Sequence, residues 1–544
     1  MDKLEDIISR DWDVIVVGTG MGGATFGHRA AVLGKKVLFL EKGKYHPKND
    51  GALVHDFAET FVKQGASVQS QKSDYADAGR WSGPYFYPGK RKEIEFTPFI
   101  GAGAGGSSAL YGGAMERFFA DDFQPGKFEH DPGSSIPGHW PVSYEEMAPY
   151  YGMAETLYRV HGSVDPLREN EGFEYLAPET MTKASKELFD FFTRGSLNPY
   201  RLPVAYDPHE DCRGCQGFLC RYQCKNDSGK ICLEPAIERH GAGLIDECDV
   251  IRLEGRKKAI EKIVCLKNGK EFKVGGRMII LSAGAVMSPL ILMNSKNEDH
   301  PQGMGNGSGM LGKNFMRHHI DLYAVFPRSS DLPGNAKEIA FNDFYVSGKY
   351  KYGTVQSFGA LPPSGVLVEE IGEDLSKKFP WFVSRAFSLI KPLVSLFLNR
   401  VFSKTLILAS IKEDLPYLEN RVELKKGVPT GALVPVLHYS LSGFERERIK
   451  HFRKLLTAKF KPYRVMLLKQ SENIERIAHV CGTCRFGDDP DTSVLNKNNR
   501  VHGMDNLYVI DASFFPSSGG TNPSLTIAAN AIRIADHLFK AGKS

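Results

Sequence analysis

The clearest hydrophobic pattern of the chain lies near its N-terminus. A run of apolar, mostly β-branched residues, Val14 to Val17, is typical of a buried strand in a parallel sheet. A helix-like segment at residues 24–33 follows, and a second apolar run at residues 36–40 predicts another strand, which ends at Glu41. The order of strand, helix and strand predicts a βαβ unit and therefore an α/β fold.

Three glycines, Gly18, Gly20 and Gly23, stand between the first strand and the helix as G-x-G-x-x-G. The first permits a tight turn, the second lets the backbone approach a pyrophosphate at the helix N-terminus, and the third lets the helix pack close to the strand. We expect Glu41 to accept hydrogen bonds from ribose hydroxyls. The motif predicts a dinucleotide site without separating FAD from NAD, and a glycine-rich turn without a ligand is the alternative.

Two further patterns lie in the middle and at the end of the chain. Residues 97–118 are dense in Gly and Ala, which would let their backbone press against a flat ligand, or form a buried glycine loop. Residues 506–511 predict a strand and residues 524–539 a helix. His479 and Asn522 lie on loops beside these elements, where polar side chains are often catalytic.

These motifs together resemble the glucose–methanol–choline (GMC) oxidoreductases, a family of FAD enzymes. The resemblance covers the βαβ unit, "GAGGSSALYGG", "MIILSAGAVMSPLILMNS" and nearly all of residues 479–539, in the order of the family. It implies an α/β fold, α+β overall, with a Rossmann-like, discontinuous FAD-binding domain at residues 1–312 and 479–544. A substrate-binding domain of a β-sheet and helices would occupy residues 313–478.

The resemblance also assigns roles to single residues. His479, in the pattern H-x-x-G-T-C, matches the catalytic histidine of the family, and Asn522, in "TNP", matches its partner. The positions that match the surroundings of the cofactor are Gly105, Gly106, Ser107, Ser108, Tyr111, Val250, Ala283, Gly284, Asp511, Ala512 and Pro523, with Asn522 itself. Tyr111 stands where many members have Asn, so it would change the hydrogen bonding near the flavin or block access.

The chemistry that these residues imply is alcohol oxidation. A neutral His479 would accept the hydroxyl proton as general base, the hydride would pass to flavin N5, and Asn522 would orient the substrate oxygen. A structural role is the alternative for His479, and a helix N-cap role is compatible with Asn522. We assign no catalytic role to His318, His319 or His502.

Five of the nine cysteines lie within residues 211–232, and four of them are close together: Cys212, Cys215, Cys220 and Cys224. Their spacing suits an iron–sulfur cluster or zinc, and free structural thiols or disulfides are the alternatives. The loop resembles that of the FAD sugar dehydrogenases that carry an iron–sulfur cluster and pass electrons to a cytochrome subunit. We expect Cys481 and Cys484, beside His479, to serve packing.

Composition and charge exclude some partners. Hydrophobic residues make up 42% of the chain and charged residues 24%, and the net charge of +5 is too mild and too evenly spread for a nucleic-acid partner. The first residues show no basic region before an apolar run, which predicts no secretory signal and a location in the cytoplasm or on the inner face of the membrane. Residues 380–402 are apolar but interrupted by basic residues and Pro392, which indicates an interfacial membrane helix or a core helix.

The sequence therefore predicts an FAD-dependent alcohol dehydrogenase or oxidase. We expect a small-molecule alcohol as substrate, whether a lipid, a sterol, a long-chain alcohol or a sugar, and a carrier protein or quinone as electron acceptor. A lyase on the same scaffold and a non-enzymatic redox flavoprotein are the alternatives.

Overall fold

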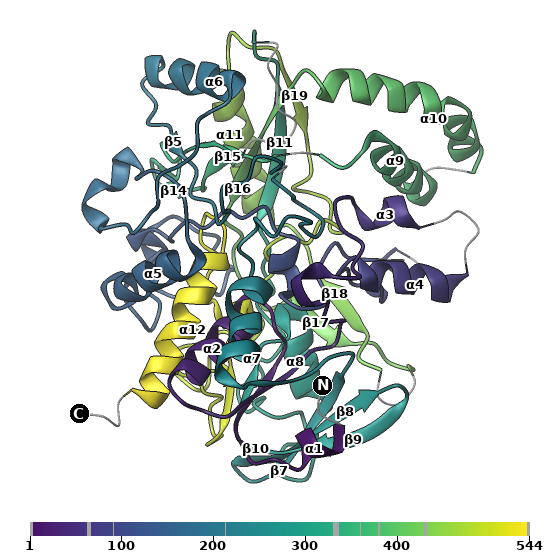
Figure 1. The fold of residues 1–544 in the computed structure, drawn as a ribbon. Coiled ribbons are helices and arrows are strands. Elements are labelled where there is room, and N and C mark those ends of the chain that lie inside the picture. Colours follow the sequence, from purple (N-terminus) through teal and green to yellow (C-terminus); the bar gives the residue numbers. More distant parts are fainter. Residues whose placement is uncertain are drawn as a thin grey trace.

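Two sheets organise the molecule, which is known here from a computed structural model. The structure describes residues 4–62, 67–90, 92–212, 214–329, 337–359, 361–378, 381–428 and 432–540. A parallel sheet lies in the lower half of Figure 1, and an antiparallel sheet lies in the upper half. The mixed α/β architecture predicted from the sequence is confirmed.

The parallel sheet draws its strands from three distant parts of the chain. Its order is β20 (Leu507–Val509), β10 (Gly276–Leu281), β1 (Trp12–Val17), β2 (Val37–Leu40) and β6 (Gly243–Ile245). Val14 pairs with Val37 on one side and with Met278 on the other, in parallel register. Residues 14–17 are buried, as expected for the central strand of a sheet that is covered on both faces.

Helices from both ends of the chain pack beside this sheet. α2 (Met21–Val32) packs against α12 (Ser524–Phe539), and α12 packs against α5 (Tyr144–Tyr158). Arg29 on α2 forms a salt bridge of 2.6 Å with Asp536 on α12. The region also contains α1 (Leu4–Ile8), α7 (Glu234–His240), α8 (Gly284–Asn294) and a three-stranded sheet of β7 (Asp249–Arg256), β8 (Ala259–Lys267) and β9 (Lys270–Val274).

The antiparallel sheet has apolar side chains on both faces. Its order is β19 (Val465–Leu468), β11 (His319–Val325), β16 (Leu406–Lys412), β15 (Val355–Ser357), β12 (Ile339–Phe341) and β5 (Tyr200–Arg201). α6 (Lys183–Arg194) and α11 (Gly443–Lys459) pack on one face through Phe192 and Phe452. Leu322 and Ile407 point to the other face, where Phe358 and Phe402 contact them. The period-2 alternation of the strands explains this division.

Smaller sheets join the two halves of the chain. β17 (Arg421–Leu424) and β18 (Pro435–His438) share a sheet with β3 (Tyr85–Pro88) and β4 (Glu93–Phe96). A hairpin of β13 (Val346–Ser347) and β14 (Tyr350–Lys351) and the helices α3 (Ala58–Phe61) and α4 (Val68–Asp77) complete the described elements. Because strands from before residue 313 enter two sheets of the later segment, the domain boundaries at 312/313 and 478/479 stay a prediction.

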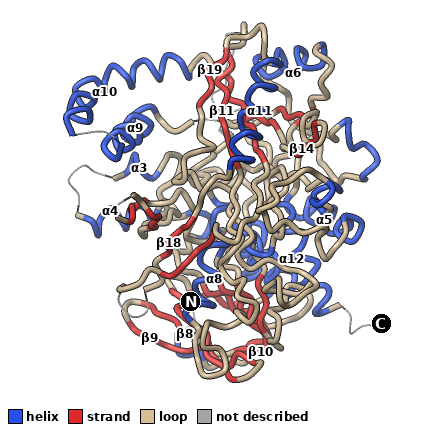
Figure 2. Tube along the Cα trace, turned by 180° about the vertical axis from the view of Figure 1, so that it is seen from behind, coloured by secondary structure: helices blue, strands red, loops and turns tan. Residues whose placement is uncertain are grey.

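A helical hairpin, α9 (Ser364–Lys378) and α10 (Trp381–Phe402), connects β15 to β16. It lies at the upper right of Figure 1, and in Figure 2, seen from behind, it lies at the upper left. None of the described α10 residues is buried. The core-helix interpretation of residues 380–402 is therefore wrong, because the apolar side chains have no core around them; residue 380 itself lies outside the described residues.

A substitution at Gly23 tests how closely α2 packs on the sheet. A Cβ atom there would lie 2.1 Å from the carbonyl oxygen of Gly18 and 3.1 Å from a methyl carbon of Val16. We expect Gly23→Ala to lower the free energy of unfolding by about 1–3 kcal/mol, as overpacking does. Gly307→Ala is the matched control, because a Cβ at Gly307 meets nothing within 4 Å. Equal unfolding midpoints in urea for the two variants would contradict the prediction.

Candidate active site

The glycine turn between β1 and α2 leaves a helix N-terminus open. Gly18 has a φ of +95°, and a Cβ there would lie 2.4 Å from the carbonyl oxygen of Ser282, so only glycine fits. Gly20 is the N-cap of α2 and offers no side-chain cap, and a Cβ on Gly20 would meet nothing within 4 Å. Exposed N–H groups at a helix N-terminus beside free space are the usual receptor of a pyrophosphate.

Glu41 lies at the end of β2, beside this turn. Its carboxylate accepts hydrogen bonds from the backbone and hydroxyl of Thr19, at 3.0 and 2.6 Å, and from the Gly43 N–H at 2.9 Å. Burial raises the pKa of Glu41. The Cys248 N–H donates to the Glu41 carbonyl at 2.9 Å, which brings the start of β7, with Val250, to the same edge. The Lys42 backbone N–H also acts on this carboxylate, so a ribose hydroxyl would share its acceptor positions with backbone donors.

The second glycine stretch packs directly on the first. Gly105 and Gly106 both have positive φ, and a Cβ on Gly106 would lie 3.0 Å from the Cα of Gly20. The Ser108 hydroxyl donates to the Gly105 carbonyl at 2.7 Å, and the Ser107 hydroxyl accepts from the Gly101 N–H at 3.1 Å. These bonds fix a 3₁₀ turn, Gly106–Ala109, against the dinucleotide turn.

Tyr111 follows this turn and its hydroxyl points into the protein. The hydroxyl donates to the carbonyl oxygen of Asn226 at 2.6 Å, and burial raises the pKa of Tyr111 well above its ordinary value. The side chain therefore remains a neutral phenol that holds the 226 loop against the glycine turn. This contact accounts for a tyrosine at a position where the family resemblance leads one to expect Asn.

Asp511 ties the ends of two parallel strands together. Its carboxylate accepts from the Gly284 N–H at 2.9 Å, from the Ser288 hydroxyl at 2.5 Å and from the Ser513 N–H at 2.9 Å. Ala283, the N-cap of α8, lies beside these donors. The Ala512 carbonyl accepts from the Gly482 N–H at 3.2 Å, so this end of the sheet also holds the loop that carries His479.

His479 and His318 form a histidine pair. Their Nδ1 atoms are 2.9 Å apart, and His318 Nε2 lies 3.0 Å from the carbonyl oxygen of Gly519. Because a carbonyl only accepts, His318 Nε2 carries a proton and its Nδ1 is the acceptor when the ring is neutral. His479 must then donate through Nδ1, which leaves the lone pair on Nε2.

Burial keeps both rings of this pair neutral. Desolvation lowers the pKa of His318 to about 4. Desolvation, together with the neighbouring His318 and Lys337, holds the pKa of His479 well below its usual value of 6.5. An unprotonated imidazole nitrogen on His479 is therefore available at neutral pH.

Asn522 is held by Gln356 of β15. The Gln356 amide donates to Asn522 Oδ1 at 2.9 Å, so the Asn522 amide N–H groups remain as donors. Both side chains are buried, and Gln356 Oε1 has no hydrogen-bond partner among the described residues. The suggested N-cap role of Asn522 is wrong: Pro523 is the N-cap of α12, because the helix starts at Ser524, and no side chain caps it.

The sequence analysis missed His318 and Gln356 as site residues. Met316 and Cys481 form an antiparallel bridge with N–H to carbonyl distances of 3.0 and 2.9 Å. Next to the bridge the His318 N–H donates to the Ala478 carbonyl at 3.1 Å, and His479, with a left-handed φ of +57°, brings its ring to that of His318. The only signal in the sequence is the pair of adjacent histidines in "MRHHIDLY", and nothing in it fixes this register.

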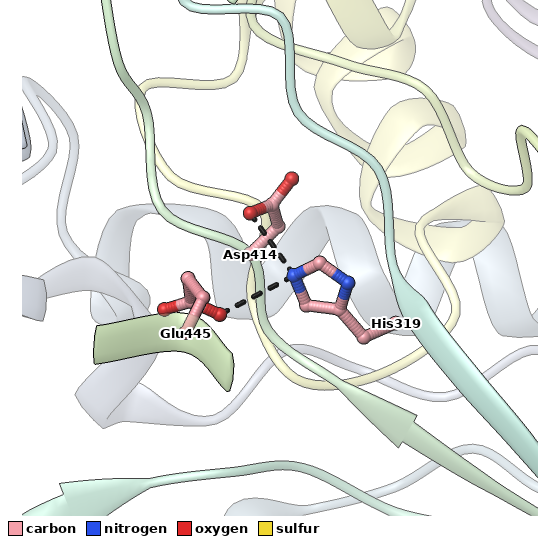
Figure 3. A group of neighbouring side chains, drawn as sticks. All are labelled: His319, Asp414 and Glu445. Carbon is pink, nitrogen blue, oxygen red and sulfur yellow. Dashed lines mark hydrogen bonds and ion pairs between the residues drawn. The ribbon is translucent and has the colours of Figure 1, made fainter. Parts of the chain in front are cut away.

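His319 points away from this pair into a buried ion network (Figure 3). Its Nε2 lies 3.1 Å from Asp414 Oδ1 and 3.3 Å from Glu445 Oε2. Three such ligands could hold a metal ion. However, Glu445 already accepts from Lys412 Nζ and Arg448, each at 2.5 Å. Although burial alone would raise it, these cations hold the pKa of Glu445 well below its usual range, so the trio is a side-chain ion network.

The four loop cysteines are brought together beside the glycine turn. Cys224 Sγ lies 3.3 Å from Cys220 Sγ and 3.5 Å from Cys212 Sγ, and Cys215 is buried in the same cluster. All nine cysteines are free thiols, so no disulfide forms. The Lys225 ammonium donates to the Ala109 carbonyl at 2.9 Å, which fastens the loop to the 3₁₀ turn. Among the described residues, no three of these sulfurs all lie within 4.8 Å of one another.

Fold and site together define a class: a dinucleotide-binding α/β protein with a neutral histidine, His479, on a loop that the end of the parallel sheet holds. Models of the N- and C-terminal parts of the GMC oxidoreductases match residues 13–320 and 416–531. The chain belongs to the GMC oxidoreductase family, whose members bind FAD and act on alcohol groups.

Two curated proteins and one solved structure are similar to the chain over nearly its whole length. Paromamine 6'-oxidase of Streptomyces fradiae is 26% identical, over 97% of this chain and 91% of that protein. The 2-methyl-1,2-propanediol dehydrogenase of Mycolicibacterium austroafricanum is 25% identical, over 97% and 95%. The crystal structure of a pyridoxine 4-oxidase from Mesorbium loti has a TM-score of 0.62 at 18% identity, covering 97% and 99%.

A substitution at Gly20 distinguishes a role in cofactor binding from a role in folding. We expect Gly20→Ala to fold normally, because its Cβ enters free space, but to retain less FAD, because that space is where a pyrophosphate would approach α2. The measurement is flavin released per protein after extensive dialysis, with Gly307→Ala as control. Wild-type flavin content in Gly20→Ala would contradict the assignment of this turn to the cofactor.

Proposed function

We propose that the protein oxidises a CH–OH group of a small-molecule alcohol to a carbonyl, with His479 as the general base. The observation that carries the proposal is the neutral His318–His479 pair, in which His318 is held by the Ser518 and Gly519 carbonyls of the loop that carries Asn522. Bound FAD would supply the hydride acceptor, held by the open N-terminus of α2, Glu41 and the Gly105–Ser108 turn. The related oxidases and dehydrogenases support the reaction class.

The proton of the alcohol passes to His479 Nε2. This nitrogen holds the lone pair because Nδ1 donates to His318 Nδ1. His318 in turn is fixed by the carbonyls of Ser518 and Gly519, at 3.2 and 3.0 Å, so the ring of the acceptor cannot turn away. The hydrogen bond from Nδ1 also fixes the orientation of the His479 ring as it takes the proton.

Asn522 binds the oxygen of the substrate. Since its Oδ1 is taken by Gln356, an amide N–H faces the reacting oxygen and stabilises the negative charge that develops there as the proton leaves. The buried, unpartnered Oε1 of Gln356 can accept a second hydroxyl of the substrate. A polar alcohol would thus satisfy an acceptor that is otherwise costly to bury.

Replacement of His479 tests the base. We expect His479→Gln to lower kcat/KM by about 10²–10⁴-fold, because the general base is lost while the size of the side chain is kept. In the wild type, activity requires neutral His479 and is lost as the pH falls through its lowered pKa. The acid limb of kcat/KM should therefore lie below pH 6.5, the ordinary value for histidine.

Two variants of His318 distinguish a role in positioning His479 from a role in folding. His318→Ala removes the acceptor and one cause of the lowered pKa of His479, so we expect kcat to fall and the acid limb to move to higher pH. His318→Gln restores an acceptor oxygen and should recover part of kcat. An unmoved acid limb in both variants, or full activity of His479→Gln, would contradict the proposed base.

We also infer that the cysteine loop provides the exit for electrons by binding an iron–sulfur cluster. The donor set fits, since four thiols lie together and cysteine thiolates are the usual ligands. Cys212, Cys215, Cys220 and Cys224 would hold the cluster, which would supply one-electron transfer to a carrier protein or quinone. The thiols must separate and lose protons to bind it; the contact with Cys224 already lowers the pKa of Cys212 to about 7.

Metal analysis decides this second proposal. We expect iron and acid-labile sulfide in protein purified without oxygen, and their loss in Cys220→Ser/Cys224→Ser with the flavin retained. Cys265→Ser, a buried cysteine of β8 outside the loop, is the control. Zinc without sulfide, or neither metal nor sulfide, would overturn the cluster and leave the proposed oxidation of the alcohol intact.

A further inference from the structure

α10 presents a continuous apolar face to solvent. The exposed fractions are 82% for Leu389, 68% for Leu393 and 67% for Leu396, and Phe382 and Phe397 are more than half exposed. Single exposed apolar side chains are ordinary on a protein surface, but a contiguous stripe marks an interaction surface. Among the described helices, α10 alone is long and apolar enough to cross a membrane.

The stripe is the outer face of an amphipathic hairpin. The inner face of α10 is held by α9: Lys391 Nζ bonds Glu369 at 2.6 Å, and the Ser395 and Ser364 hydroxyls are 2.7 Å apart. Leu389, Leu393 and Leu396 follow at spacings of three and four residues, which places them together on the opposite face. Among the residues that the structure describes, this face therefore has no packing partner.

The charges around the stripe are positive. The segment from Trp381 to Lys404 contains no acidic residue, and its basic residues Arg385, Arg400 and Lys404 are exposed. Two acids of α9 are paired with cations: Glu369 with Lys391, and Glu370 with Arg476 at 2.5 Å. An apolar face bordered by cations suits a bilayer with anionic headgroups.

The connections of α10 to the rest of the chain limit how it can bind a bilayer. Its 22 residues would span about 33 Å. Both ends return to the same sheet, however, through α9 to β15 and directly to β16, and Lys391 and Pro392 interrupt the middle. A spanning helix would have to bury Lys391 and its partner Glu369 in hydrocarbon. The geometry favours a helix that lies in the plane of the interface.

We propose that the outer face of α10 docks the protein on the surface of a lipid bilayer that contains anionic lipids. The basic side chains at its borders would reach the headgroups while the leucines and phenylalanines enter the acyl region. The hairpin leaves the sheet directly after Gln356 and Ser357, so docking would hold the candidate site near the membrane. This proposal does not depend on the proposed reaction.

Vesicle sedimentation of the full-length, flavin-loaded protein tests the docking. We expect the wild type to sediment with vesicles of phosphatidylcholine and phosphatidylglycerol, less with phosphatidylcholine alone, and less at high salt. Leu389→Ser/Leu393→Ser/Leu396→Ser should lower partitioning by more than about tenfold, since three exposed apolar side chains are lost. Arg385→Gln/Arg400→Gln should remove the preference for anionic vesicles.

Leu167→Ser/Leu176→Ser is the matched control, because both leucines are exposed, at 50% and 42%, outside the hairpin. It should sediment like the wild type, and all variants should keep the flavin. A wild type that stays in the supernatant, or a triple leucine variant that sediments unchanged, would overturn the proposal. So would a dimer in solution that the triple variant converts to a monomer, since the face would then bind a second copy.

Discussion

The candidate site depends on one short backbone bridge, between Met316 and Cys481. Its two hydrogen bonds, at 3.0 and 2.9 Å, join the start of the antiparallel sheet to the loop held by the parallel sheet. The His318 N–H then donates to the Ala478 carbonyl at 3.1 Å, and His479 has a left-handed φ of +57°. The short pairing and the turn beside it therefore bring the two rings together.

The environment behind this bridge keeps the histidines neutral. Burying an imidazole disfavours its charged form, and Lys337 adds a positive charge nearby. On the other face of the same strand, His319 contacts Asp414 and Glu445. The Ser518 hydroxyl donates to the Asp414 carbonyl at 3.0 Å, which ties the network to the loop that binds His318. The network thus lies beside the loop that holds His318, while Lys337 is a charged group that acts on His479.

The cysteine loop and the α9–α10 hairpin lie on different sides of the candidate site. The cysteine loop is fastened to the glycine turn through Lys225 and Ala109, on the cofactor side. The α9–α10 hairpin emerges between β15 and β16, on the substrate side, next to Gln356. Under the two proposals above, the site would have an exit for electrons on one side and a lipid-docked helix on the other. This arrangement would suit an enzyme that works at a membrane surface.

The sequence by itself determined the elements whose signals are local. The apolar run Val14–Val17, the glycine spacing and the helix at residues 524–539 needed only neighbouring residues, and the structure has them where predicted. Family motifs led to His479 and Asn522, but their roles stay predictions. Only the tertiary structure decided the tautomer of His479, the orientation of Asn522 and the exposure of α10. These depend on partners more than a hundred residues away or on the absence of a covering layer, and no local pattern encodes either.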